Sequence, residues 1–143
     1  MKLAYSRPLP AEIVVGQDAC DFVCLKTDTI YRGGVGVGLK RNGIIVAAAM
    51  FDHYLGNSIQ IHIAIDGPLT RECPFVAFDY PFRQAQVKKL LAHIDSTNEK
   101  SIHFAERTGF TKEACIQDGG RYADLLIYSM TKEQCRYLGR KNA

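Results

Sequence analysis

The sequence predicts a mixed α/β domain of the α+β class, in which flanking helices pack on a twisted, mostly antiparallel sheet of six to seven strands. Three observations support this fold class. Short apolar runs separated by turn signals fill residues 12–65, helical patterns follow, and strand patterns return near the end of the chain. The 143 residues can bury one core and are too few for two ordinary domains, so we expect a single domain over residues 1–143.

One short helix is expected near the start of the chain. Residues 12–15 form a β run, and Asp18 is a candidate N-cap for a helix over Ala19–Lys26. The glycine-rich run Gly33-Gly34-Val35-Gly36-Val37-Gly38 comes next. It opens no helix and has no Walker lysine, so it predicts a twisted or bulged strand and not a phosphate-binding loop.

An antiparallel meander is expected after this run. Strands over residues 35–39 and 44–51 are joined by the turn Arg41-Asn42-Gly43. A second turn leads into the strand Ser58–Ile65, in which every odd position is isoleucine. Side chains alternate between the two faces of a strand, so Gln60, His62 and Ala64 share the face opposite these isoleucines.

A helical crossover is predicted in the second half. Residues Leu69–Phe82 show two apolar helical stripes, which is typical of a helix buried on both sides. The following run, Val87–Ile94, reads as a strand. A right-handed crossover allows the strands Ser58–Ile65 and Val87–Ile94 to lie adjacent and parallel, as the one parallel pair of the sheet.

The next helix has the clearest signals in the sequence. Ser96-Thr97-Asn98-Glu99 matches a capping box, and Gly109 after Thr108 is a typical left-handed residue at a helix end. Two more strands are predicted, near Glu113–Gln117 and Asp124–Met130, and a short helix over Lys132–Leu138 closes the chain.

Composition and charge exclude several classes of function. No apolar stretch reaches about 18 uncharged residues and the first residues lack a signal peptide, so we expect a cytoplasmic protein without a membrane partner. Eighteen Lys and Arg against fifteen Asp and Glu give a net charge of +3. The basic residues are scattered along the chain and form no block, which does not indicate binding of nucleic acid. Five cysteines and four histidines lack metal-ligand spacing, so we predict reduced thiols and no metal.

One sequence pattern, together with the order of elements, resembles a known superfamily. The pattern is Asn98-x-x-Ser101-x-x-x-x-Glu106-x-x-Gly109-Phe110, followed by Asp124-x-x-x-Tyr128-x-Met130. It resembles the GNAT superfamily of acyl-CoA-dependent N-acetyltransferases, nearest to the Rim-type ribosomal-protein N-terminal acetyltransferases. The resemblance implies a GNAT-like fold with a splayed parallel strand pair. It also implies transfer of an acetyl group from acetyl-CoA to a primary amine: a protein N-terminus, a lysine or a small amine.

The resemblance also implies where the acyl donor would bind. The implied contact residues are Ile63, Ala64, Ile65, Leu69, Thr70, Arg71 and Asn98. The first three would pair through their backbone with the pantetheine arm, and the next three lie at a helix N-terminus that would face the pyrophosphate. Where the family usually has a glycine-rich loop, this chain has Asp66-Gly67-Pro68. Asn98 either binds the donor or completes the helix cap.

Ser101 is the candidate group for the leaving thiolate. Many family members place a tyrosine seven residues after the asparagine, where this chain has Ala105. Ser101 shares a helical face with Asn98, so it would be able to hydrogen-bond the thiolate of the departing CoA. The alternative is that Ser101 is a small packing residue.

His62 is the first candidate for the general base. The acceptor ammonium must lose a proton before it attacks the thioester, and imidazole, with an unperturbed pKa of about 6.5, suits that transfer. The alternative is that His62 is an ordinary structural histidine of a strand. Asp66 and Glu72 are weaker candidates, because acids in a first helical turn also serve as partners of the helix dipole.

The acceptor side is expected to be short. About twenty residues separate the first two predicted strands, which leaves room for one helix where the family usually has two. Either the acceptor site is open, as a protein N-terminus or lysine requires, or a second subunit of a homodimer completes it. The alternative function is a non-catalytic module of the same fold that binds a protein partner, or CoA without turnover.

Overall fold

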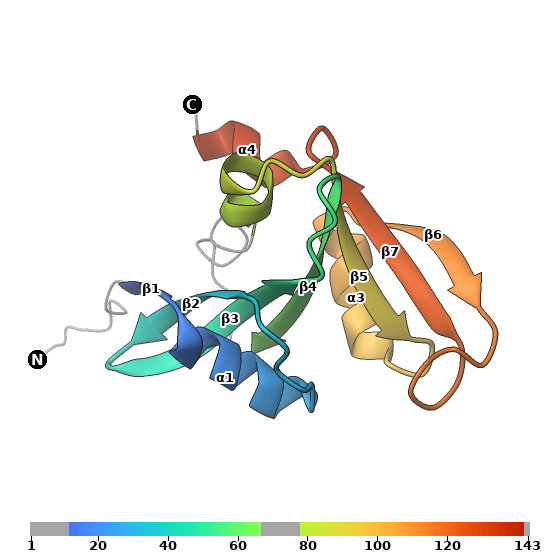
Figure 1. The fold of residues 1–143 in the computed structure, drawn as a ribbon, viewed down its shortest axis with the longest axis horizontal. Coiled ribbons are helices and arrows are strands. Elements are labelled where there is room, and N and C mark those ends of the chain that lie inside the picture. The colour runs from blue at the N-terminus through green and yellow to red at the C-terminus, as the bar shows by residue number, and fades with distance from the viewer. Residues whose placement is uncertain (1–11, 67–77, 142–143) are drawn as a thin grey trace, which may run out of the picture. The chain divides into compact units, whose positions relative to one another are not determined.

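The computed structural model describes residues 12–66 and 78–141 of the chain. The elements in chain order are β1 (Glu12–Val15), α1 (Gln17–Thr27), β2 (Val35–Arg41), β3 (Ile44–Asp52), β4 (Ser58–Ile65), the helical turn η2 (Tyr80–Gln84), β5 (Lys89–Asp95), α3 (Glu99–Thr108), β6 (Thr111–Ile116), β7 (Leu125–Thr131) and α4 (Arg136–Lys141) (Figure 1). The strands pair in the order β1-β2-β3-β4-β5-β7-β6. The sheet is mostly antiparallel, with β4 and β5 as its parallel pair, which confirms the predicted fold class.

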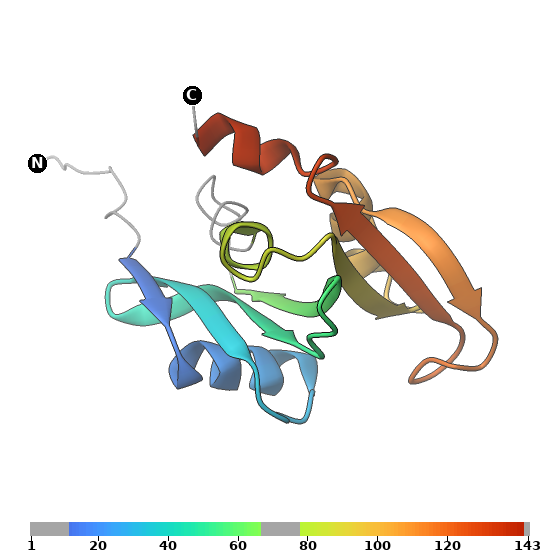
Figure 2. The same ribbon diagram turned by 45° about the horizontal axis from the view of Figure 1, so that its top comes forward.

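The chain divides into two compact units. The first comprises Met1–Met50 with Ile63–Ala77, and the second comprises Phe51–His62 with Phe78–Ala143. Strands β3 and β4 both continue from one unit into the other. Within the first unit α1 packs beside β2, and within the second α3 packs beside β5, next to the β6–β7 hairpin (Figure 2).

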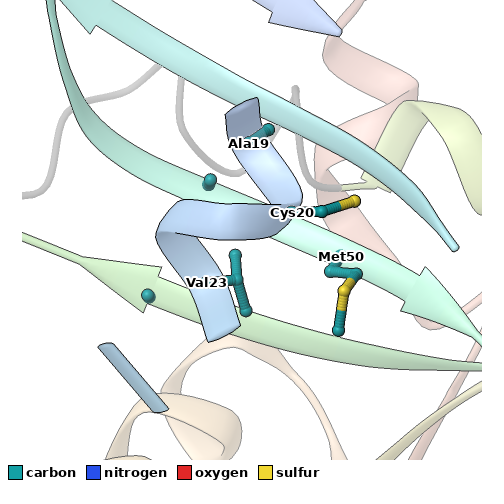
Figure 3. Close-up of a cluster of buried hydrophobic side chains, with 6 residues drawn as sticks. Ala19, Cys20, Val23 and Met50 are labelled. Atoms are coloured by element: carbon teal, nitrogen blue, oxygen red, sulfur yellow. The ribbon is translucent and has the colours of Figure 1, made fainter. Parts of the chain in front are cut away.

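The core of the first unit is built from small and flexible side chains. The cluster against α1 buries Ala19, Cys20 and Val23 of α1, Ala48 and Met50 of β3, and Ala64 of β4, and a second cluster buries Leu39 and Ala47. Figure 3 shows Ala19, Cys20 and Val23 on α1 and Met50 on the neighbouring strand, all members of the cluster against α1. Alanines on the sheet face leave room for a closely packed helix, and methionine fills the remaining irregular space.

The glycine-rich run forms the sheet surface that α1 covers. A Cβ atom at Gly36 would lie only 2.7 Å from both the backbone nitrogen of Cys20 and the carbonyl oxygen of Gly16. At Gly38 a Cβ atom would lie 3.3 Å from the Ala48 Cβ atom of β3 and 3.4 Å from the Ala19 Cβ atom of α1. Glycine therefore occupies these positions of β2 because the helix approaches its backbone closely, which agrees with the prediction of a strand.

The prediction that Asp18 caps α1 is wrong. The helix begins at Gln17 after Gly16, with no side-chain cap, and Asp18 lies in its first turn. Gly16 has a φ of 126°, and its N–H donates to the Gly36 carbonyl across 2.9 Å. The helix start is thus fixed by a backbone conformation that only glycine adopts easily, and by an anchor on β2.

The parallel pair β4–β5 is short. Its register joins Ser58 with Lys89, Ile59 with Leu90 and Gln60 with Leu91. Beyond this point β5 continues to Asp95 in antiparallel pairing with β7. The predicted parallel adjacency of the two strands is confirmed, and the parallel ladder ends after three residue pairs.

The crossover segment is described only from Phe78 onward, so most of the predicted helix Leu69–Phe82 lies outside the described residues. Its last part is the wide turn η2, closed by the bond from the Ala85 N–H to the Tyr80 carbonyl, five residues back. Pro81 inside this turn cannot donate to a regular helical ladder, which favours the wider turn. Phe78 is buried and stacks on Tyr137 with ring centroids 5.4 Å apart.

The prediction of a capping box at Ser96 is also wrong. The N-cap of α3 is Asn98, whose Oδ1 accepts a 3.2 Å hydrogen bond from the Ser101 N–H. Ser96 instead accepts from the Asp124 N–H through its hydroxyl. The predicted helix end is confirmed, since Gly109 is left-handed and the Phe110 N–H donates to the Ala105 carbonyl.

The final elements follow the predicted order with shifted bounds. β6 and β7 form a hairpin with an irregularity between Lys112 and Ala114. The last helix, α4, begins at Arg136 and not at Lys132. The residues before it form a turn in which the Thr131 N–H donates to the Gln134 side chain and the Gln134 N–H donates back to the Thr131 hydroxyl. This reciprocal pairing has the pattern of a capping box, and it closes a separate turn before α4 begins at Arg136.

Candidate active site

His62 lies on β4 in the second unit and contacts a buried carboxylate. Its Nε2 atom is 2.9 Å from Oδ1 of Asp52, the last residue of β3. The Asp52 side chain is only 6% exposed, and that of His62 is 17% exposed. A carboxylate removed from water to this degree requires hydrogen-bond donors, so the imidazole is held in one orientation.

His53 supplies a second donor to the same oxygen. Its Nδ1 atom is 3.0 Å from Asp52 Oδ1, while its side chain is 59% exposed. His53 has a φ of 54°, a left-handed conformation that is uncommon for residues other than glycine. This conformation turns the chain out of β3 directly after Asp52, and the tight turn that follows is closed by the bond from the Leu55 N–H to the Ser58 carbonyl.

A third imidazole lies within electrostatic range. His93, on β5 opposite Ile127, has a pKa below its usual value, chiefly because of desolvation and then because of repulsion by His62 and His53. Asp52 acts in the opposite direction and raises this pKa. One carboxylate therefore sits among three imidazoles, all within the second unit.

Asn98 and Ser101 are brought together at the start of α3. The Asn98 side-chain oxygen serves as the helix cap, which agrees with one of its two predicted roles. The Ser101 hydroxyl is half-buried and has no hydrogen-bond partner in the described part of the chain. Ala105, at the position where many family members have tyrosine, is buried in the core. Among residues 12–66 and 78–141, no hydrogen bond joins Ser101 to His62.

Two other residues of the recognised pattern bind each other. The buried Tyr128 hydroxyl donates a 2.8 Å hydrogen bond to Glu106 of α3. Burial, and then the Glu106 carboxylate, raise the pKa of Tyr128 to about 12. Tyr128 therefore stays protonated at neutral pH and ties β7 to α3, which is a structural role.

The expected donor-binding residues fall into three groups. Ile63, Ala64 and Ile65 form the end of β4, and the Ala64 side chain belongs to the core of the first unit. The Asp66 N–H donates to the Val46 carbonyl of β3 across 2.7 Å. Because backbone groups alternate along a strand, the N–H groups of Ile63 and Ile65 point away from β3. The second group, Leu69, Thr70 and Arg71, lies outside the described residues, as does Glu72, and the third is Asn98.

Asp66 has a cationic partner. Its carboxylate lies 3.1 Å from the Lys26 ammonium of α1, and both side chains are exposed. The negative charge that the sequence places beside the expected pyrophosphate loop is therefore paired within the first unit.

Sequence reasoning found His62 but missed Asp52 and His53. The available signal was strand alternation, which places Ala48, Met50 and Asp52 on one face of β3. The described residues contain no group of three or more His, Cys, Asp or Glu arranged to hold a metal ion. Cys20, Cys24, Cys115 and Cys135 form no disulfide within the described residues. No helix in the described ranges is long and apolar enough to cross a membrane.

Comparisons with known proteins give a result only at the level of structure. No protein-family model matches the sequence, and no curated protein matches it. Among solved structures, a mutant of the spermidine N-acetyltransferase SpeG from Vibrio cholerae is similar with a TM-score of 0.71 and 15% identity, over 92% of this chain and 98% of that one.

Two further solved structures show the same similarity. SpeG of Vibrio cholerae in complex with manganese ions gives a TM-score of 0.69 at 17% identity, over 91% of this chain and 96% of that one. An acetyltransferase structure from T. thermophilus gives 0.62 at 16% identity, over 78% of this chain and 65% of that one. At such identities the similarity establishes the fold alone, so the chain has the fold of the GNAT acetyltransferases.

Proposed function

We propose that this protein is an N-acetyltransferase that transfers the acetyl group of acetyl-CoA to a primary amine by direct attack. The observation that carries the proposal is the fold, which includes a parallel β4–β5 ladder that ends at Gln60 and Leu91. Beyond that point the N–H groups of Ile63 and Ile65 point away from β3 and offer the edge that a pantetheine arm would need. Because the fold alone does not establish the reaction, the proposed mechanism also depends on the individual residues of the site.

The donor-binding role is assigned to backbone groups and a few side chains. Ile63 and Ile65 would donate to the pantetheine amides and polarise the thioester carbonyl, and Ala64 would keep β4 in place from the core. Leu69, Thr70 and Arg71 are proposed to hold the pyrophosphate. Asn98 would contact the donor through its amide NH₂, since its oxygen already caps α3.

His62 is proposed as the general base and Ser101 as the partner of the leaving group. The imidazole takes a proton from the acceptor ammonium, and the freed lone pair forms the C–N bond at the thioester carbonyl carbon. When the C–S bond breaks, its electron pair stays on sulfur, and the Ser101 hydroxyl would donate a hydrogen bond to the developing thiolate. The thiolate then takes up the second proton of the attacking nitrogen, which leaves the neutral amide and the CoA thiol as products. The Ser101 hydroxyl is suited to this because no described residue engages it.

The acceptor class is proposed to be an open-access primary amine. One helix, α1, lies between β1 and β2, so the wall on this side is short, as a protein N-terminus or lysine would require. The Rim-like pattern favours a protein N-terminus, whereas the SpeG structures make spermidine a small amine worth testing. A second copy of the chain in a homodimer is the alternative way to complete the acceptor wall.

A non-catalytic module is the second candidate, and Ala105 favours it. The position where many related enzymes have a tyrosine acid carries a buried methyl group that cannot donate a proton. Such a module would bind a protein partner, or CoA without turnover.

Ligand-dependent melting separates these alternatives at the first step. A ligand that binds only the folded protein at 100 times its Kd adds about 2.7 kcal/mol of stability. We expect acetyl-CoA and CoA to raise Tm in a dose-dependent way and ATP at the same concentration to leave it unchanged. If Tm rises, CoA release with N-terminal peptides, lysine peptides and spermidine tests turnover. No rise at millimolar acetyl-CoA would contradict the proposed enzyme and favour the partner-binding module.

A further inference from the structure

We propose that Asp52 is a positioning residue for His62, which holds the imidazole as its Nε2–H tautomer and leaves Nδ1 as the atom that accepts the proton. This inference rests on the proposed N-acetyltransferase function, because it assigns a second residue to the same proton transfer. It concerns a side chain for which neither the sequence pattern nor the structural comparisons give a role.

The geometry of the hydrogen bonds fixes the tautomer. An ionised carboxylate has no proton to donate, so both imidazole nitrogens near Asp52 Oδ1 must carry hydrogen. His62 therefore donates from Nε2 across 2.9 Å, and His53 donates from Nδ1 across 3.0 Å. In a neutral His62 ring the other nitrogen, Nδ1, then has a free lone pair. That lone pair is the only basic site left on the His62 ring.

The burial of Asp52 makes its hydrogen bond with His62 costly to break, so the imidazole keeps its orientation. With 6% of its side chain exposed, the carboxylate has little water to replace a lost donor. Rotation of the His62 ring away from Oδ1 would leave the buried carboxylate with His53 alone of the two imidazole donors found in the described chain, which is costly. His53 fills the other direction at the oxygen, and its left-handed backbone places it there.

The surrounding charges favour an imidazolium on His62 once it has taken the proton. Titratable groups that interact within this cluster include Asp52 and His53 at the end of β3 and His93 of β5. Desolvation and then the neighbouring imidazoles lower the pKa of His93, which opposes a competing positive charge on that ring. Asp52 then supplies the negative charge that stabilises the positive ring formed on proton transfer.

Histidine nitrogen NMR tests the proposal without relying on turnover. In the unaltered protein we expect the His62 nitrogen shifts of an Nε2–H tautomer. In Asp52→Ala they should move to a mixture of both tautomers, because the acceptor is gone. The matched control is Asp21→Asn, which alters an exposed carboxylate of α1 that accepts from Gln17. It should leave the His62 shifts unchanged.

A second variant keeps the test valid if Asp52→Ala does not fold. Asp52→Asn retains an oxygen acceptor and removes the charge, so we expect an intact Nε2–H tautomer. Its kcat/KM should fall about tenfold or more, and the acidic limb of its pH profile should move to lower pH. An acidic limb unchanged in Asp52→Asn would overturn the positioning role.

The two proposals fail in different ways. An Nδ1–H tautomer in the unaltered protein, or unchanged His62 shifts in Asp52→Ala, would overturn the role of Asp52 even if acetyl transfer is observed. Conversely, an Nε2–H tautomer that depends on Asp52, in a protein that transfers no acetyl group to any amine, would overturn the enzyme and with it the catalytic meaning of the pair.

Discussion

Two neighbouring positions on one face of β3 are buried for different reasons. Met50 is fully buried among the side chains of α1, and Asp52, two residues on, is also buried but contacts two imidazoles. Burial of Met50 removes apolar surface from water and makes no directional demand. Burial of Asp52 is tolerated only with hydrogen-bond donors in fixed places. Burial alone therefore does not distinguish a core residue from a residue of the candidate site. The two are distinguished by the side chains that each contacts.

Truncation at the apolar position should have the largest effect on stability. Met50→Ala is expected to lower the free energy of unfolding by about 3 kcal/mol, because it removes buried contacts and leaves a cavity. The control Leu25→Ala, at a side chain of α1 that is 82% exposed, should change it by less than about 0.5 kcal/mol. Urea denaturation measures both, and equal losses would contradict the assignment of the core to this face of β3.

Substitution of the candidate base should reduce activity and spare stability. His62→Gln is expected to lower kcat/KM for acetyl transfer about 100-fold and to flatten the acidic limb of the pH profile, since glutamine cannot take a proton. The matched control is His103→Gln on the exposed side of α3. It should retain the kcat/KM of the unaltered protein and the acidic limb of its pH profile. A normal acidic limb in His62→Gln would eliminate His62 as the base.

The candidate thiolate partner should have a smaller effect. Ser101→Ala is expected to lower kcat about tenfold, a change of about 1.4 kcal/mol in activation free energy, and to leave the Kd for acetyl-CoA nearly unchanged. Steady-state rates and a binding titration measure the two quantities separately. A comparable loss of unfolding free energy, with unchanged kcat, would assign Ser101 to packing.

The smallest effect is expected at Asp95, a partly exposed carboxylate whose hydrogen-bond donors differ from those of Asp52. Asp95 accepts hydrogen bonds from Thr97, Tyr122 and Ala123, which hold its pKa well below the usual range. Because the folded-state pKa is lowered, this stabilisation is present above about pH 4 and is lost as the pH falls further. At pH 6 the urea midpoint of Asp95→Asn should therefore lie below that of the unaltered protein. At pH 3 the difference between the two midpoints should be smaller. A constant difference would contradict this role.

Local patterns in the sequence predicted much of the fold. The alternating isoleucines indicated β4, and the left-handed Gly109 indicated the end of α3, because both signals depend on neighbours in the chain. The prediction of Ser96 as the N-cap was wrong because two possible cap residues, Ser96 and Asn98, lie close together in the sequence. The Ser96 hydroxyl instead accepts a hydrogen bond from the Asp124 N–H, which comes from a distant segment. Local chemistry cannot choose between them.

The candidate site was predictable only in part, for a related reason. His62 was identified from its position on a strand, whereas Asp52 and His53 read as the polar end of an apolar run. Their contact with His62 depends on how β3 and β4 align, and one residue of slip would move the side chains to opposite faces. Only the structure fixes that alignment.

Acetyl transfer itself tests the account most directly. The measurement is the rate of CoA release, with acetylated amine identified by mass spectrometry, for the unaltered protein and His62→Gln in the presence of acetyl-CoA and the panel of primary amines. We expect an acetylated product whose rate of formation falls about 100-fold in His62→Gln. Tight binding of acetyl-CoA without any acetylated amine would contradict it and identify a CoA-binding module of the same fold.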